Sequence, residues 1–81
     1  MGDEQLLTRI VSDPQIMAGK PVVRGTRLTV GFLLNLLGHG MTPDEILVDY
    51  SGLSADDISA CLLFASQSVD DTTFLPLAES A

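Results

Sequence analysis

The sequence has little positive charge, and all of that charge lies in the first third. It holds 4 Lys and Arg against 11 Asp and Glu, for a formal net charge of −7. Residues 28–81 contain eight acids and no Lys or Arg. Affinity for nucleic acid comes largely from Lys and Arg that displace counterions from phosphates. The stretch after residue 27 is therefore disfavoured as a nucleic-acid surface.

Cysteine and histidine are almost absent, with one of each. Cys61 alone cannot form an intrachain disulfide, which fits a reducing cytosol. No set of three or four N or S ligands for a metal can be assembled. Asp56 and Asp57 are adjacent, so on a helix they point about 100° apart, and we interpret them as first-turn acids. We expect no metal, no cofactor and no enzymatic activity.

Long apolar runs are also missing, although the overall hydrophobic content is 46%. No run approaches the roughly 18 residues of a membrane span, and residues 1–7 do not look like a signal peptide. We therefore expect a cytoplasmic protein with no membrane partner. A chain of 81 residues forms one domain with a small core. Surplus apolar surface commonly marks an interface, so we expect a homodimer or a complex with another protein.

The first part of the chain predicts a short β arm over residues 9–28. β-Branched residues favour strands at residues 9–12 and 22–24, separated by the turn signal Asp13-Pro14. Gly25 and Thr26 predict a second turn. Three cations on this arm are candidates for nucleic-acid contact, although exposed charges that protect an edge strand are the plainer interpretation. They are Lys20, Arg24 and Arg27.

Residues 29–69 predict three helices. Thr29 is a candidate N-cap for the first, and Thr42 with Glu45 forms a capping box for the second. Ser54 opens the third, which we expect to end near Ser68 because Asp70 would oppose the helix dipole. The last two helices have the layout of a helix-turn-helix, which is also an ordinary way to fold short helices. The predicted fold is mainly α: a short N-terminal β-hairpin or arm, then a three-helix, helix-turn-helix-like bundle, within a single domain, 1–81.

Some apolar residues lie outside the main apolar face of their helix or in the tail, residues 70–81. We expect them, with the apolar side chains of the two strands, to form a dimer or partner interface. The candidates are Ile10, Val11, Val22, Val23, Phe32, Leu36, Phe74 and Leu75.

Four segments carry a family resemblance: residues 10–14, 19–30, 40–47 and 53–58. The run Gly-Lys-Pro-Val-Val-Arg-Gly-Thr-Arg in the second segment is the most specific. Over roughly residues 9–66 the chain resembles the domain-of-unknown-function 433 family. The resemblance implies a homeodomain-like helical region, similarity to VapB-type antitoxins and pairing with a PIN-like ribonuclease toxin. It supplies no catalytic residues.

These observations together favour a non-catalytic, antitoxin-like protein. We expect it to dimerise through its N-terminal strands and to neutralise a PIN-like nuclease toxin. It could also regulate its own gene by binding DNA through the basic arm. The acids at the start of the third helix oppose the usual docking of a helix-turn-helix on DNA. The alternatives are a stand-alone DNA-binding transcriptional regulator and a purely structural dimerisation module.

Overall fold

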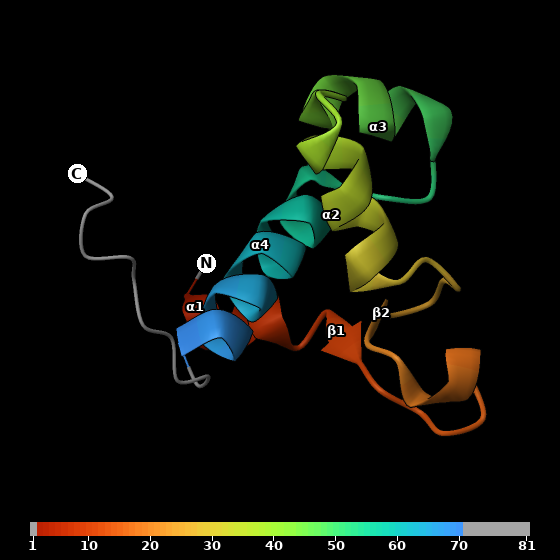
Figure 1. Ribbon diagram of the computed structural model, residues 1–81, viewed down its shortest axis with the longest axis vertical. Coiled ribbons are helices and arrows are strands. Elements are labelled where there is room, and N and C mark those ends of the chain that lie inside the picture. The colour runs from red at the N-terminus through yellow and green to blue at the C-terminus, as the bar shows by residue number, and fades with distance from the viewer. Residues whose placement is uncertain (1, 71–81) are drawn as a thin grey trace, which may run out of the picture.

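The computed structural model describes residues 2–70, which form a mainly helical domain with one short antiparallel sheet (Figure 1). The predicted fold class is confirmed. Residues 71–81, which include Phe74 and Leu75, lie outside the described residues. In order, the elements are α1 (Asp3–Leu7), β1 (Ile10–Val11), the 3₁₀-helix η1 (Met17–Gly19), β2 (Val22–Val23), α2 (Val30–Gly38), α3 (Pro43–Asp49) and α4 (Ala55–Asp70).

The core lies where α2, α3 and α4 meet, and strand β2 closes it. Leu33 of α2, Ile46 of α3 and Cys61 of α4 are each 0% exposed. Val23 of β2 belongs to the same buried cluster and is 1% exposed. Helices α2, α3 and α4 thus each contribute at least one fully buried side chain, as expected for amphipathic helices that share one small core.

The two strands pair as predicted but are shorter than predicted. Ile10 lies opposite Val23, and Val11 lies opposite Val22. Val22 also forms an isolated bridge to Thr29, just before α2. Strand β2 therefore pairs on one side with β1 and on the other with the residue before α2, and so links the start of α2 to the N-terminal segment.

The predicted helix caps of α2 and α3 are confirmed. The Phe32 N–H donates to Thr29 Oγ1 over 3.0 Å. The Glu45 N–H donates to Thr42 Oγ1 over 3.2 Å, and the Thr42 N–H donates to Glu45 Oε1 over 2.8 Å. These contacts satisfy backbone N–H groups that a helix start leaves without a partner.

Two helix boundaries differ from the prediction. Helix α4 continues past Ser68 to Asp70, because one exposed carboxylate near a helix end costs at most about 1 kcal/mol. Residues 3–7, which precede the predicted β arm, form the additional helix α1. Five residues are too few for a stable isolated helix. Here α1 packs against α4, and Leu6 and Leu7 are half-buried.

The turn after β2 depends on Gly25, which has a φ of +82°. The Thr26 N–H donates to Val23 O over 3.0 Å, and the Leu28 N–H donates to Thr26 Oγ1 over 3.0 Å. The predicted Gly-Thr turn is thus confirmed. A side chain at position 25 would force an L-residue into a backbone region that costs about 1–2 kcal/mol.

We expect Gly25→Ala to lower the free energy of unfolding by about 1 kcal/mol, as measured by urea denaturation. The control is Gly31→Ala in α2, where φ is not positive and an added Cβ also meets open space. That variant should be neutral or slightly stabilising, because alanine is the better helix former. Equal losses in both variants would contradict a backbone cause.

Candidate functional site

An open groove lies between η1 and the start of α2. Its two adjoining hollows have volumes of about 370 and 320 Å³. Apolar side chains form most of the lining, and two cations lie beside them. The residues are Met17, Lys20, Pro21, Arg27, Leu28, Thr29, Gly31 and Phe32. A concave apolar surface flanked by charge is a typical binding site.

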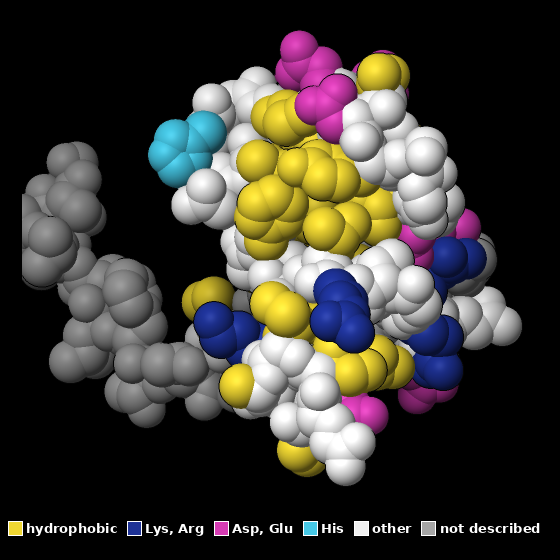
Figure 2. All heavy atoms as spheres, turned by 90° about the vertical axis from the view of Figure 1, so that its right-hand side faces the viewer, with side chains coloured by type: hydrophobic (Ala, Val, Ile, Leu, Met, Phe, Trp, Pro, Cys, Tyr) yellow, Lys and Arg dark blue, Asp and Glu magenta, His cyan; other side chains and the backbone are white. Residues whose placement is uncertain are grey.

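The groove opens onto a larger apolar area over α2 and α3, which we call the Phe32 face. Phe32 is 41% exposed and meets Tyr50 edge-on, with ring centroids 5.8 Å apart. Leu36 lies one turn after Phe32 on α2 and is half-buried. Figure 2 shows this apolar area with Lys and Arg side chains below it and Asp and Glu side chains above it. The Phe32 face is therefore apolar in its centre and oppositely charged at its two edges.

The two charged edges of the Phe32 face come from different parts of the chain. The lower edge carries Lys20 and Arg27, which line the groove together with Phe32. The upper edge is α3, at the top of Figure 1, and its acids are all exposed: Asp44, Glu45 and Asp49. Two of these acids are there because a first helical turn favours negative charge.

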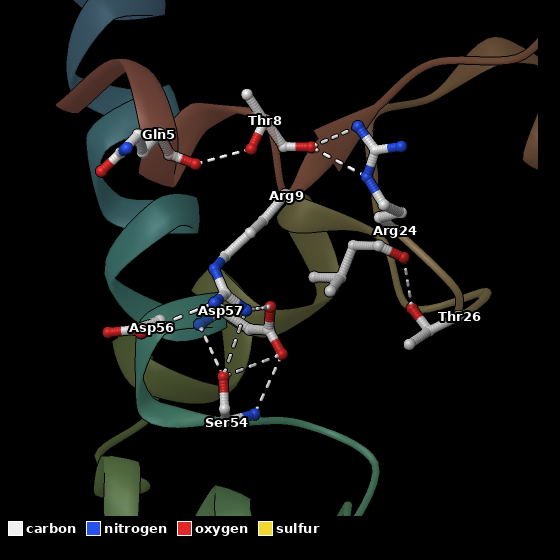
Figure 3. Close-up of polar contacts among 9 residues, drawn as sticks. Gln5, Thr8, Arg9, Arg24, Thr26, Ser54, Asp56 and Asp57 are labelled. Atoms are coloured by element: carbon white, nitrogen blue, oxygen red, sulfur yellow. Dashed lines mark hydrogen bonds and ion pairs between the residues drawn. The ribbon is translucent and has the colours of Figure 1, made fainter. Parts of the chain in front are cut away.

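The three predicted nucleic-acid-binding cations have different surroundings in the structure. The Arg24 guanidinium donates to Thr8 O from Nε over 3.0 Å and from Nη2 over 2.6 Å (Figure 3). Arg24 thus holds the end of α1 to the chain after β2. Among residues 2–70, the side chains of Lys20 and Arg27 have no hydrogen-bond or ion-pair partner. Only those two lie on the groove.

Arg9, which the sequence reasoning did not single out, joins the N-terminal segment to the start of α4. Its Nη1 donates to Asp57 Oδ1 over 3.1 Å, and its Nη2 lies 3.5 Å from Asp56 Oδ2 (Figure 3). Asp57 is 8% exposed, and its Oδ2 also accepts from the Ser54 N–H over 2.9 Å. The interpretation of Asp56 and Asp57 as first-turn acids agrees with this geometry. The cap within 54–57 was visible in the sequence, whereas nothing local marked Arg9 as its partner.

The predicted strand interface needs correction at β2. Val22 and Val23 are each 1% exposed, so the chain itself covers both side chains, and Val23 belongs to the main core cluster. They leave no side-chain surface for a partner. Ile10 and Val11 of β1 are half-buried, so β1 retains part of its surface.

The outer side of α4 carries a second exposed apolar strip. Leu62 is 49% exposed and Val69 is 62% exposed. Residues seven apart lie on one side of a helix, two turns from each other. Helices α1, α3 and α4 contain acids, and none of the described helices contains Lys or Arg. Arg9 contacts the first turn of α4, at the opposite end of that helix from Val69, so the charges on the helices around this strip are mainly negative.

The groups with catalytic potential are separated. Burial, with a smaller contribution from the nearby Asp57 charge, raises the pKa of the Cys61 thiol from 9.0 to about 11, which favours the unreactive thiol. His39 Nδ1 lies 2.8 Å from Asn35 O at the end of α2. Within residues 2–70, no group of three or more His, Cys, Asp or Glu could hold a metal ion. In the same range, no helix is long and apolar enough to cross a membrane.

The described residues thus form a small, mainly helical domain with a two-stranded sheet. This domain has an open apolar groove and a separate exposed apolar strip on its last helix. A family model described as "Protein of unknown function (DUF433)" matches residues 10–65, and the chain belongs to this family. The crystal structure of a DUF433 member protein from Anabaena variabilis is similar, with a TM-score of 0.74 and 29% sequence identity. The similarity covers 84% of this chain and 67% of that chain. No curated protein matches the sequence.

Proposed function

We propose that this chain is a non-catalytic, antitoxin-like protein that binds and neutralises a PIN-like nuclease. The observation that carries the proposal is the exposed apolar strip of Leu62 and Val69 on an otherwise acidic helical body. The resemblance of the family to VapB-type antitoxins supplies the class of partner.

The physical basis is the pairing of apolar burial with charge complementarity. A nuclease that acts on RNA holds the phosphate backbone with basic side chains. A helix that carries an apolar strip, and whose own charged residues are all acidic, can occupy such a basic site. Burial of Leu62 and Val69 would supply affinity, whereas the acids would guide encounter and select the partner.

DNA binding is a second candidate function, and the exposed pair Lys20 and Arg27 favours it. The amount of available charge is small, because Arg9 and Arg24 contact groups within the chain. Two phosphate contacts give a salt dependence with a slope of only about −2 per chain. We therefore rank binding of a protein partner first.

The test is co-expression with a PIN-like nuclease encoded by an adjacent gene, followed by a measured affinity; absence of any such neighbour would count against the proposal. We expect Leu62→Asp and Val69→Asp each to weaken the complex at least about tenfold, since a buried anchor typically contributes more than 1 kcal/mol. Val48→Asp is the control, because Val48 is 79% exposed on a different helix, α3. Equal affinity in all three variants, or no complex with a folded nuclease, would contradict the proposal.

A further inference from the structure

The Phe32 face has an unusual distribution of charge for a chain with a net charge of −7. Lys20 and Arg27 line the groove together with Phe32, which is 41% exposed, and the acids of α3 are all exposed. Figure 2 shows an apolar area with Lys and Arg side chains on one side of it and Asp and Glu side chains on the other. Elsewhere in the described chain, Arg9 and Arg24 contact the chain's own groups. Among the described residues, the cations that remain available to a negatively charged partner thus lie at the Phe32 face.

We propose that the Phe32 face is the contact surface of a two-fold symmetric homodimer. A two-fold interface uses the same surface on both copies, so this surface must be complementary to itself. When the axis crosses the face between its charged edges, Lys20 and Arg27 of each chain lie against the α3 acids of the other. Phe32 of each chain then packs at the centre, beside the axis, where aromatic anchors contribute most.

A second copy fits this face better than a nucleic acid does. A polyanion would gain from Lys20 and Arg27 but would be repelled by the exposed acids of α3 on the same face. A second copy satisfies both edges at once. Two chains of charge −7 repel each other over most of their surfaces, and this repulsion disfavours other arrangements.

The dimer proposal does not depend on the nuclease. Leu62 and Val69, which carry the proposed function, are not part of the Phe32 face. Dimerisation is measured with the chain alone, whereas capture of the nuclease is measured in a separate assay. Failure of one proposal is therefore distinguishable from failure of the other.

The experiment uses two charge-reversed variants of the full chain, analysed by sedimentation velocity at micromolar concentrations. The first carries Lys20→Glu with Arg27→Glu, so that both edges become negative. The second carries Asp44→Lys with Asp49→Lys, so that both edges become positive. We expect each variant alone to dimerise at least about tenfold more weakly than the wild type. An equimolar mixture should regain a dimer, because each negative edge then meets a positive one.

Two controls separate this interface from general effects of charge and folding. Asp3→Lys with Glu4→Lys on α1, which packs against α4, makes the net charge less negative by the same amount as Asp44→Lys with Asp49→Lys, and should leave the dimer intact. Circular dichroism confirms that each variant is folded. The proposal is overturned if the wild type is a monomer at every concentration measured. It is also overturned if the equimolar mixture forms no more dimer than the two variants form separately. It is also overturned if a monomeric wild type binds duplex DNA through Lys20 and Arg27.

Discussion

Replacing Asp57 with alanine should lower the free energy of unfolding by about 3 kcal/mol, measured by urea denaturation near neutral pH. Two losses combine. The Ser54 N–H loses its acceptor at the start of α4, a loss that typically costs about 1 kcal/mol. Arg9 also loses its main partner. This ion pair is only partly buried, with side-chain exposures of 34% for Arg9 and 11% for Asp57, so its loss costs about 2 kcal/mol, between the values for exposed and buried pairs.

The neighbouring residue provides a matched control. Asp56 also faces Arg9, but its side chain is 50% exposed and its Oδ2 lies 3.5 Å from Arg9 Nη2. An exposed ion pair contributes at most about 1 kcal/mol. Asp56→Ala should therefore lower stability by less than 1 kcal/mol. A similar loss of stability in the two alanine variants would contradict the larger contribution assigned to the buried Asp57.

A double-mutant cycle isolates the contact between Arg9 and Asp57. We expect the combined Arg9→Met and Asp57→Ala variant to be clearly more stable than the sum of the two single losses predicts. The reason is that each single variant leaves one member of the Arg9–Asp57 pair without the other, whereas the double variant contains neither member. Additive losses would mean that the two side chains contribute independently.

The capping residues illustrate what the sequence could show. Thr29, Thr42 with Glu45, and Ser54 were found because a cap joins groups only two or three residues apart. The contact from Arg9 to Asp57 spans 48 residues, and no periodicity or spacing marks it. Local signals therefore placed the starts of α2, α3 and α4 correctly but did not show which N-terminal side chain contacts the start of α4.

The strands and α1 show a different kind of limit. Val22 and Val23 were correctly placed in a strand, but a pair of valines does not reveal whether they face the chain's own core or a partner. Helix α1 was missed because its stability comes from packing against α4 and not from its five residues alone. Phe32 was recognised by its position off the main apolar stripe, and its 41% exposure agrees with that prediction.

Tertiary contacts decide which of the basic side chains remain available to a partner, and the composition did not reveal this. The sequence showed a basic segment of three residues, Lys20, Arg24 and Arg27, as one candidate surface. In the structure Arg24 holds the end of α1, while Lys20 and Arg27 remain on the groove beside Phe32. The functional surface is therefore smaller than the basic arm, and it includes apolar side chains and acids from helices later in the chain.

Cys61 should react very slowly with alkylating reagents as long as the protein is folded. It is 0% exposed, and burial together with the charge of Asp57 raises its pKa from 9.0 to about 11. The thiolate is the reactive form. At pH 8 its fraction falls roughly 100-fold when the pKa rises by two units. We expect iodoacetamide to label the native chain at least 100-fold more slowly than the chain in urea, as followed by mass spectrometry.

The same shift predicts a loss of stability at high pH. Because the folded-state pKa is raised, the folded chain favours the protonated thiol. This contribution is complete below pH 9 and is lost as the pH rises toward 11. The loss amounts to about 2–3 kcal/mol, since each pKa unit corresponds to about 1.4 kcal/mol. The informative quantity is the difference in the free energy of unfolding between the wild type and Cys61→Ala, because the contributions of all other groups cancel in it. That difference should fall by about 2–3 kcal/mol between pH 8 and pH 11. A constant difference, or rapid labelling of the native chain, would show that the thiol is accessible to water.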